Sequence, residues 1–516
     1  MILLRFRTWW GLAACVCALS ACGEEGPGAA TVASEGEVRQ DDVGGGPAGA
    51  SLDFPEGVSE SERAQAVADW LRVEGPIDLE ESFTCIIGGP QPSNLTGPHK
   101  ETVLEEGASA LLQNEEALKA AAQGLFDAGH RQATIARLGG MGWTRQVHNV
   151  PWGLIEAPKD SLHFELLDAV VAATGSEGMH YVGTFAPFAA WALECRAEAG
   201  PECAHYLSDD LYYLSHENKM DLPCEPEQIP ELLGLLAERY DGDGQDDMPG
   251  LVVPIKIWQM GNEVEAHAQC GSYLGALDDY LTWVNEGAAA IHASCPDCQI
   301  MLGGALAIHG NEIQEQGLKF WEDFVAKGGG DAIDIIAIHY NQGKSGGSTI
   351  EQFVGMIDTY REIFGDKPIW VTEFGVLVEV ETEDGQTAEN FSHLSEEDAA
   401  AWLLRFYTAG LNAGVAKFFS DYIGFVSRDE VQLTFYTNLL IQSKLLGFSH
   451  SERLAEGQYR FEVNGRSVYV LWGQAALDRS ITGQLTLTDM YGVRTEKDAS
   501  ELVLSDVPLF AEPVIP

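Results

Sequence analysis

Two glutamates, each at the end of an apolar segment, are the residues best placed to do chemistry. Glu263 follows Ile255-Lys-Ile-Trp-Gln-Met-Gly-Asn, and Glu373 follows the similar segment Pro368-Ile-Trp-Val-Thr. Short apolar, aromatic segments are typical of buried parallel strands, which present functional residues at their C-terminal ends. Hydrolysis of a glycosidic bond needs one carboxyl group that gives a proton and a second carboxylate near the anomeric carbon. The spacing therefore predicts a pair of carboxylates, Glu263 and Glu373, that face one another across a sugar.

Alternating strand-like and helix-like segments must position these glutamates. The predicted strands are Phe83–Ile87, Gln132–Leu138, Met179–Phe185, Val253–Gly261, Gln299–Leu306, Ala332–His339, Pro368–Thr372 and Ala416–Asp421. The predicted helices are Glu115–Ala128, Ser161–Ala173, Glu227–Tyr240, Leu277–His292, Leu318–Ala326, Ser348–Phe364, Glu396–Ala413 and Asn438–Leu446. Eight strand–helix repeats predict the α/β class and a (β/α)8 TIM barrel, whose strands all end at one rim.

The pattern changes after residue 446 to short strands between turns. Tyr459–Val463, Asn464-Gly465 and Ser467–Trp472 predict a hairpin. Further strands are predicted at Gln484–Thr488, Val493–Glu496, Glu501–Leu504 and Pro508–Ala511. We expect a catalytic barrel over residues 56–446 and a small all-β, sandwich-like domain over residues 447–516.

The N-terminus has the features of an export signal. Arg5 and Arg7 precede the apolar stretch Trp9–Leu19, which is too short to span a bilayer and ends in Leu-Ser-Ala-Cys22. This pattern predicts a lipoprotein signal peptide over residues 1–21 and a lipid on Cys22, with an ordinary secretory peptide as the alternative. Residues 22–55 are rich in Gly, Ala and acidic residues and predict a flexible tether. We expect an exported protein, anchored to a membrane only by its lipid, in the periplasm or at the cell surface.

The charge excludes one class of partner, and the cysteines suit an exported protein. With 79 acidic residues against 30 Lys and Arg, the formal charge is −49, which argues against binding nucleic acid. An odd number of cysteines follows Cys22, so one should be a free thiol, and strand-like surroundings favour Cys85 as a buried one. Cys295-Pro-Asp-Cys298 predicts a local disulfide, because no second Cys or His pair accompanies it as a zinc site would need.

The two glutamate segments resemble motifs of a known group of enzymes. Trp258-Gln-Met-Gly-Asn-Glu263 resembles the strand-four motif of clan A glycoside hydrolases, and Ile369-Trp-Val-Thr-Glu373-Phe-Gly resembles their strand-seven motif, as in families 39, 30 and 51. The resemblance implies a retaining enzyme that cleaves an oligo- or polysaccharide by double displacement. It also implies that Glu263 is the acid/base, Glu373 the nucleophile and Asn262 a ligand of the sugar 2-hydroxyl. Glu265 competes for the acid role, but the loop geometry should turn it off the site.

Other candidate substrate-binding residues rest on looser matches. Arg137, in Ile135-Ala-Arg-Leu138, resembles the strand-two arginine that supports the nucleophile in these enzymes. His339-Tyr340 resembles their strand-six pair, which orients the nucleophile or binds the sugar. We also expect aromatic rings to stack on sugar faces. These are Trp143, Trp152, Trp191 and Tyr422. Packing in the core is the alternative for each of these aromatic residues.

No cofactor is expected. Asp241, Asp243 and Asp247 begin a calcium-loop spacing, but Val252 stands where such a loop has glutamate, so an acidic turn is favoured over structural calcium. A metal-dependent hydrolase would need more ligands at the strand ends than His339 supplies. A non-catalytic carbohydrate-binding surface lipoprotein on the same fold is the other alternative. Such a binder would be expected to lose one catalytic glutamate, whereas this chain has both.

Overall fold

The computed structural model describes residues 80–87, 95, 97–146, 150–195, 222–266, 273, 275–306, 312–340, 349–375, 394–421, 426–427 and 430–514. The predicted signal peptide, Cys22, the tether and Tyr422 lie outside these residues. None of the described helices is both long enough and apolar enough to cross a membrane.

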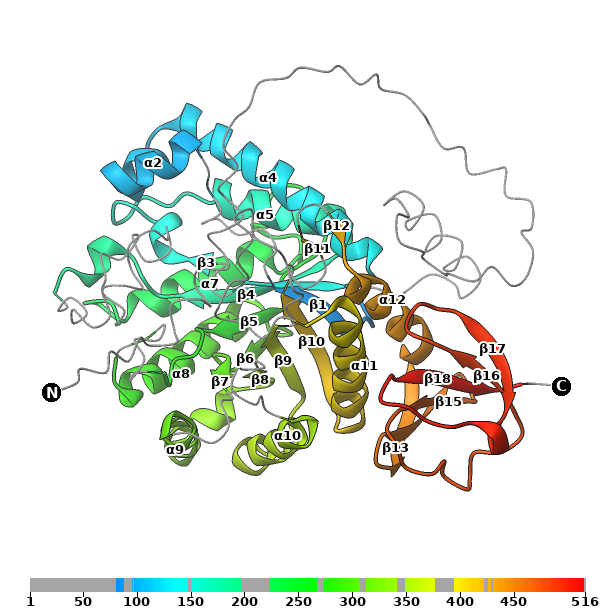
Figure 1. The fold of residues 1–516 in the computed structure, drawn as a ribbon. Helices are drawn as coiled ribbons and strands as arrows, with labels where there is room; N and C mark the ends of the chain where they lie inside the picture. Colours follow the sequence, from blue (N-terminus) through cyan, green and yellow to red (C-terminus); the bar gives the residue numbers. More distant parts are fainter. Residues whose placement is uncertain are drawn as a thin grey trace, which may run out of the picture.

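Eight strand positions form the parallel barrel that the sequence predicts (Figure 1). In order around it they are β1 (Thr84–Ile87), β2 (Trp143–Arg145), β4 (His180–Ala186), β5 (Ile257–Met260), β6 (Gln299–Met301) with β7 (Ala305–Leu306), β8 (Ile336–His339), β9 (Ile369–Phe374) and β10 (Val415–Asp421). The last strand, β10, pairs with β1 in parallel, and the short β3 (Val150–Pro151) adds to β4. The fifth position is split, since β6 pairs with β5 whereas β7 pairs with β8.

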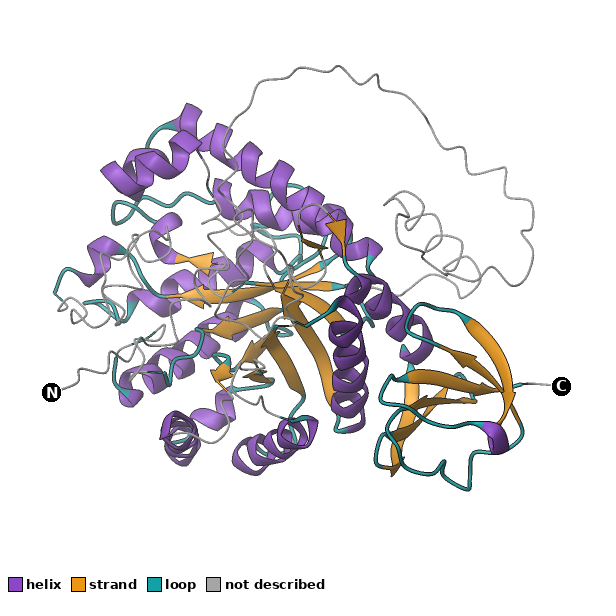
Figure 2. Ribbon diagram, in the orientation of Figure 1, coloured by secondary structure: helices purple, strands orange, loops and turns teal. Residues whose placement is uncertain are grey.

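Helices surround the strands (Figure 2). They are α4 (Glu115–Leu138), α5 (Glu165–Ser176), α7 (Gln228–Tyr240), α8 (Leu277–Ser294), α9 (Glu312–Ala326), α10 (Ile350–Phe364), α11 (Glu396–Asn412) and α12 (Leu433–Leu445), with α2 (Gly97–Glu106) and α3 (Ala108–Leu112) before α4. Helix α10 shows how the sequence sets the start, the buried face and the end of a helix. Thr349 and Gln352 form a capping box at its start, Phe353, Met356 and Tyr360 bury one face, and the helix ends before Gly365.

The segment 132–138 is helical, so the strand predicted there is wrong. It completes α4, whose buried residues recur every three or four positions. They are Leu118, Ala121, Leu125, Gly129, Ala133 and Ala136. The second barrel strand is instead β2, which is only three residues long. The buried residues of α4 repeat with the helical period of 3.6 residues along its whole length. The segment 135–138 resembles a strand only when it is considered without the residues before it.

The C-terminal β-domain is one antiparallel sheet of six strands. These are β13 (Phe448–Ala455), β14 (Gln458–Val463), β15 (Arg466–Leu471), β18 (Leu509–Pro513), β16 (Gln484–Thr488) and β17 (Arg494–Asp498), in that spatial order. The predicted hairpin is present, and Asn464 and Gly465 both have positive φ, as a tight primed turn requires. The segment 501–504 is not a strand, because Ala499–Glu501 forms a 3-10 turn.

One face of this sheet packs on the barrel where a sandwich would place a second sheet. Phe461, Val470 and Phe510 belong to the same hydrophobic core as the barrel. Lys444 of α12 also forms an ion pair with Glu512 of β18 at 2.6 Å. Leu471, Leu485 and other residues form a separate small core within the domain. The sequence does not reveal β13, since Ser449-His-Ser-Glu452 lacks an apolar alternation.

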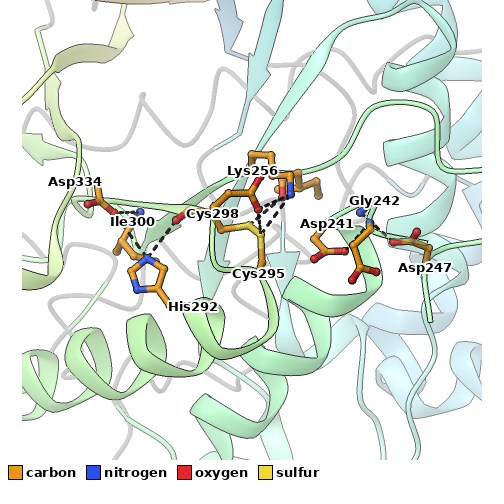
Figure 3. The surroundings of a disulfide bond; sticks show 12 residues. Asp241, Gly242, Asp247, Lys256, His292, Cys295, Cys298, Ile300 and Asp334 are labelled. Atoms are coloured by element: carbon orange, nitrogen blue, oxygen red, sulfur yellow. Dashed lines mark hydrogen bonds and ion pairs between the residues drawn. A yellow bond between two sulfur atoms is a disulfide. The ribbon is translucent and has the colours of Figure 1, made fainter. Parts of the chain in front are cut away.

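The cysteine predictions are confirmed where the structure describes them. Cys295 and Cys298 form the expected local disulfide, Cys195 bonds Cys224, and Cys85 is a buried free thiol. Figure 3 shows the local disulfide beside Lys256, whose Nζ lies 3.7 Å from the Cys295 sulfur. Because Cys298 immediately precedes β6, this disulfide lies at the N-terminal end of the barrel, where TIM barrels place stabilising features.

Candidate active site

Glu263, Glu373 and His339 meet at the C-terminal end of the barrel. Glu263 follows β5, His339 ends β8 and Glu373 lies near the end of β9. One carboxylate oxygen of each glutamate and one ring nitrogen of His339 all lie within 4.8 Å of one another. His339 Nδ1 is 2.8 Å from Glu263 Oε1 and 3.5 Å from Glu373 Oε2. The structure thus brings together three of the residues that the sequence selected.

A strained turn delivers Glu263 to this position. Its φ is +46°, in the left-handed region that residues with a Cβ rarely occupy, at a typical cost of about 1–3 kcal/mol. The turn begins at Gly261, where a Cβ would lie 2.9 Å from the Trp283 ring. The backbone N–H of Glu263 donates to the Gly304 carbonyl at 3.1 Å. Such strain persists only where the surroundings hold it, and it is concentrated at functional sites.

The break between β6 and β7 makes room for His339. Gly304 has a φ of +60°, and a Cβ there would lie 2.5 Å from His339 Nε2. This nitrogen has no hydrogen-bond partner among the described residues. The imidazole is therefore fixed by glycine contact on one side and by the two carboxylates on the other.

Arg145, which the sequence analysis missed, connects the site from the end of β2. Its side chain is fully buried. Its Nη1 lies 3.3 Å from Glu373 Oε2 and 3.4 Å from the Thr372 carbonyl, and its Nη2 donates to Asn262 Oδ1. Its Nε donates to Gln259 Oε1 at 2.8 Å. One guanidinium thus contacts the nucleophile candidate and the residue beside the acid candidate.

Arg137, the arginine that the sequence favoured, lies elsewhere. It is in the last turn of α4, outside the barrel, and its Nε donates to Glu177 at 2.7 Å. Because the segment is a helix, Arg137 cannot lie at a strand end, and the arginine that contacts Glu373 is Arg145. The available signal was that Gly139-Gly140-Met-Gly142 separates the helical period from Trp143-Thr-Arg145.

Burial sets the protonation states of the site. It raises the pKa of Glu263 to about 7, against the opposing effect of the Arg145 charge. It also lowers the pKa of His339 to about 3, where Glu373 opposes the shift and Arg145 adds to it. Burial lowers the pKa of Arg145 too, but a guanidinium starts so high that it stays charged. Near neutral pH the site therefore holds a neutral imidazole and a carboxyl group poised between its two states.

Glu265 lies two residues beyond Glu263 and is turned into the protein. It is buried, and its Oε1 accepts the Leu306 N–H at 2.5 Å at the end of β7. This contact ties the turn after β5 to the neighbouring strand. Burial raises the pKa of Glu265 to about 8.

Glu265 should make the fold less stable as pH rises. The unfolded chain releases this proton near pH 4.5 and the folded chain near pH 8, so the free energy of unfolding falls across that window. In Glu265→Gln, the fall between about pH 5 and about pH 8 should shrink by roughly 3 kcal/mol. Urea unfolding of both proteins at the two pH values measures it. Parallel pH dependence in the two proteins would show that Glu265 does not hold a proton in the fold.

Two of the expected substrate-binding residues, Trp143 and Tyr340, are in the core. The Trp143 ring stacks on His180 and meets Trp370 edge-on, near the starts of their strands and away from the catalytic rim. Tyr340 is buried, packs against Phe353 and donates its hydroxyl to the Thr349 carbonyl. Since side chains alternate along a strand, Tyr340 lies outside the barrel where His339 lies inside. Neither ring faces the carboxylates.

Trp152 and Trp191 lie together in the loops beyond the rim. Trp152 is buried and donates to Glu156 Oε2 at 2.7 Å. Trp191 is half-buried, meets Trp152 edge-on at 5.2 Å, and donates to the Glu156 carbonyl at 2.8 Å. Trp152 therefore packs in the protein. The Trp191 ring retains an exposed part.

The acidic turn before β5 lies away from the catalytic rim. Carboxylate oxygens of Asp241, Asp243 and Asp247 lie within 4.8 Å of one another. Those of Asp247 accept the backbone N–H groups of Gly242 and Gly244 at 3.0 and 2.8 Å. Figure 3 shows this turn near Lys256 and the disulfide.

Comparison with known proteins agrees with this geometry. Residues 280–405, which include His339 and Glu373, match the family described as glycosyl hydrolase catalytic core. No curated protein matches the chain in sequence. Among solved structures, a family 39 glycoside hydrolase from Bacteroides cellulosilyticus WH2 is 16% identical with a TM-score of 0.53, covering 85% of this chain and 82% of its own.

Two further solved structures match less well. A family 30 endoxylanase from Clostridium papyrosolvens C71 is 11% identical with a TM-score of 0.44, over 75% of this chain and 92% of its own. An α-L-arabinofuranosidase from Thermotoga maritima is also 11% identical with a TM-score of 0.44, over 75% and 90%. Residues 280–405 thus match a glycosyl hydrolase catalytic core, and the chain shares the barrel fold of the family 39 structure.

Proposed function

We propose that the protein cleaves glycosidic bonds of an oligo- or polysaccharide with retention of anomeric configuration. The observation that carries this proposal is the short separation of Glu263 and Glu373, whose nearest carboxylate oxygens lie within 4.8 Å. Retaining enzymes hold their carboxyl groups about 5–5.5 Å apart, whereas inverting enzymes leave about 6.5–9.5 Å for a water molecule. The short separation suits direct attack by one carboxylate on the sugar.

Glu373 is the nucleophile and Glu263 the acid/base in this mechanism. Arg145 places its positive charge 3.3 Å from Glu373, beside the carboxylate that attacks the anomeric carbon. Glu263 protonates the departing oxygen, and it then takes a proton from the water that releases the covalent glycosyl intermediate. A carboxyl group with a pKa of about 7 suits both steps near neutral pH.

Asn262 and His339 complete the site. Arg145 occupies Asn262 Oδ1, so the amide N–H groups of Asn262 are those that donate to the sugar 2-hydroxyl. His339 stays neutral and donates its Nδ1–H toward the carboxylates, which leaves a bare lone pair at the unpartnered Nε2. The partly exposed Trp191 ring is the remaining sugar-stacking candidate among the described residues.

An exported location fits this activity. A lipid on Cys22 and a tether over residues 22–55 would hold the barrel at a membrane surface, where it meets extracytoplasmic carbohydrate. Labelling cells with radioactive palmitate and comparing wild type with Cys22→Ala tests this location. Equal labelling of the two proteins would exclude the anchor.

A panel of aryl glycosides and plant or algal polysaccharides tests the activity itself. Proton NMR of the first sugar released should show the anomer of the substrate, and a 2-fluoro glycoside should label Glu373. Release of the opposite anomer would show an inverting mechanism. Labelling of a different residue would remove Glu373 as nucleophile, and no hydrolysis across the panel would count against catalysis.

The alkaline limb of the pH profile should report Glu263. Its proton is needed by the leaving group and is lost as pH rises through about 7, so kcat/KM should fall roughly tenfold per pH unit above that point. Glu263→Gln should lack this limb when it is assayed with an activated aryl glycoside, whose leaving group needs no proton. A limb that persists in Glu263→Gln would belong to a different group.

A further inference from the structure

Gln259 is a fully buried polar side chain in β5, directly behind the site. Its Oε1 accepts Arg145 Nε at 2.8 Å and the Thr184 hydroxyl at 3.0 Å. Its Nε2 donates to the Leu302 carbonyl at 3.0 Å. The side chain touches neither catalytic glutamate through any of these hydrogen bonds. Its role must therefore be sought in what Arg145 does.

The surroundings fix which way the Gln259 amide faces. A guanidinium has only donors, so the oxygen of the amide must point at Arg145. The Leu302 carbonyl is only an acceptor, so the nitrogen must point at Leu302. A flipped amide would place donor against donor and acceptor against acceptor in a buried site, where unsatisfied polar groups are costly.

The hydrogen bond at Nε of Arg145 restricts the orientation of its two terminal nitrogens. The guanidinium is planar, so a hydrogen bond at Nε sets the direction of both terminal nitrogens. Those nitrogens contact Glu373 Oε2 and Asn262 Oδ1. The bond from Gln259 therefore restricts where Arg145 places its charge relative to two residues of the site.

We propose that Gln259 is a positioning residue, which locks the plane of the Arg145 guanidinium and thereby aims it at both Glu373 and Asn262. This inference rests on the proposed retaining mechanism for its kinetic consequences. The hydrogen-bond chain runs from Leu302 and Thr184 through Gln259 to Arg145, and so joins β4, β5 and the residue after β6 to the catalytic rim. A displacement of reacting groups by about 1 Å commonly costs about 10²-fold in rate.

Two substitutions separate positioning from mere packing. Gln259→Met keeps the length of the side chain and removes its hydrogen bonds, so kcat/KM should fall by about 10²-fold. Gln259→Glu nearly keeps the shape and adds a negative charge that Arg145 holds ionised. That charge offsets the effect of Arg145 on Glu263, so the alkaline limb should move up by about one pH unit. The uncharged Gln259→Met should also move the limb to higher pH, because a misplaced Arg145 lowers the pKa of Glu263 less, whereas a packing role alone would leave the limb of this variant unchanged.

Gln442 provides a matched control. It is also fully buried, and its Nε2 donates to Ser82, Thr84 and the Gly140 carbonyl at the start of β1, the opposite end of the barrel. Gln442→Met and Gln442→Glu should lower the melting temperature while leaving the position of the alkaline limb unchanged. A shift of the limb in these controls equal to that in Gln259→Glu would overturn the positioning role.

Different outcomes contradict this inference and the proposed function. Loss of activity in Glu373→Gln together with unchanged kcat/KM and pH limb in folded Gln259 variants would overturn positioning alone. If wild type hydrolyses no glycoside, carbon-13 NMR titration of labelled glutamate, assigned with Glu263→Gln, still applies. A Glu263 titration that is identical in wild type and Gln259→Glu would then overturn the positioning role. If Gln259→Met does not fold, Gln259→Glu carries the test.

Discussion

Glu373→Gln should lower kcat/KM by at least about 10⁴-fold, because the amide cannot form the covalent glycosyl intermediate. The substitution changes the size of the side chain little, and the amide oxygen can still accept from Arg145, which lies 3.3 Å from this carboxylate. The fold should therefore survive, and circular dichroism with thermal unfolding verifies this. An activated aryl glycoside is the right substrate, since it minimises the demand on Glu263 and isolates the nucleophilic step.

Azide rescue sharpens this test by assigning a role to each glutamate. In Glu373→Ala, azide should attack the sugar directly and give a glycosyl azide of inverted configuration. In Glu263→Ala, azide should replace water on the covalent intermediate and give the retained configuration. Retained product from Glu373→Ala, or turnover by Glu373→Gln within tenfold of wild type, would show that another group is the nucleophile.

Arg145→Met should have the next largest effect, a loss of about 10²–10³-fold in kcat/KM, comparable to removing one strong electrostatic contact from an active site. The substitution removes the charge beside Glu373 and leaves Asn262 and Gln259 without their donor. Because Arg145 holds the pKa of Glu263 down, the alkaline limb should also move to higher pH. Steady-state kinetics from pH 5 to pH 9 measures both effects.

Two matched variants test whether charge alone is enough at Arg145, and whether Arg137 contributes to activity. Arg145→Lys keeps a cation but not the planar fork, so it should fall between wild type and Arg145→Met. Arg137→Met removes the exposed arginine of α4 and should change kcat/KM less than twofold. A large loss in Arg137→Met with full activity in Arg145→Met would reverse the assignment that the structure supports.

The sequence predicted those parts of the site that follow long apolar strands. Glu263 and Glu373 each follow an apolar run long enough to identify as a strand, and such strands end at the same rim of a barrel. Arg145 was missed because β2 is only three residues long and follows a helix with an apolar end. Gln259 was missed because a glutamine inside a strand looks like a neutral polar residue until its partners from other strands are known.

The remaining errors concern side-chain direction and not strand position. Residue His339 was correctly placed at a strand end, but alternation sends the adjacent Tyr340 to the opposite face. Trp143 lies on a barrel strand, yet at the end remote from the carboxylates. A linear pattern indicates which element a residue belongs to, but the depth of that residue along the barrel axis depends on register between strands.

The shared core of the barrel and the β-domain has a consequence for how the chain behaves as a unit. Phe461, Val470 and Phe510 would be exposed to water if the β-sheet were detached, and so would the face of the barrel that they cover. Neither part can therefore melt while the other stays intact without uncovering apolar surface, so heat should unfold both in one cooperative step. The sheet is therefore part of the same folding unit as the barrel. A gene fragment that ends after α12 would encode an incomplete protein.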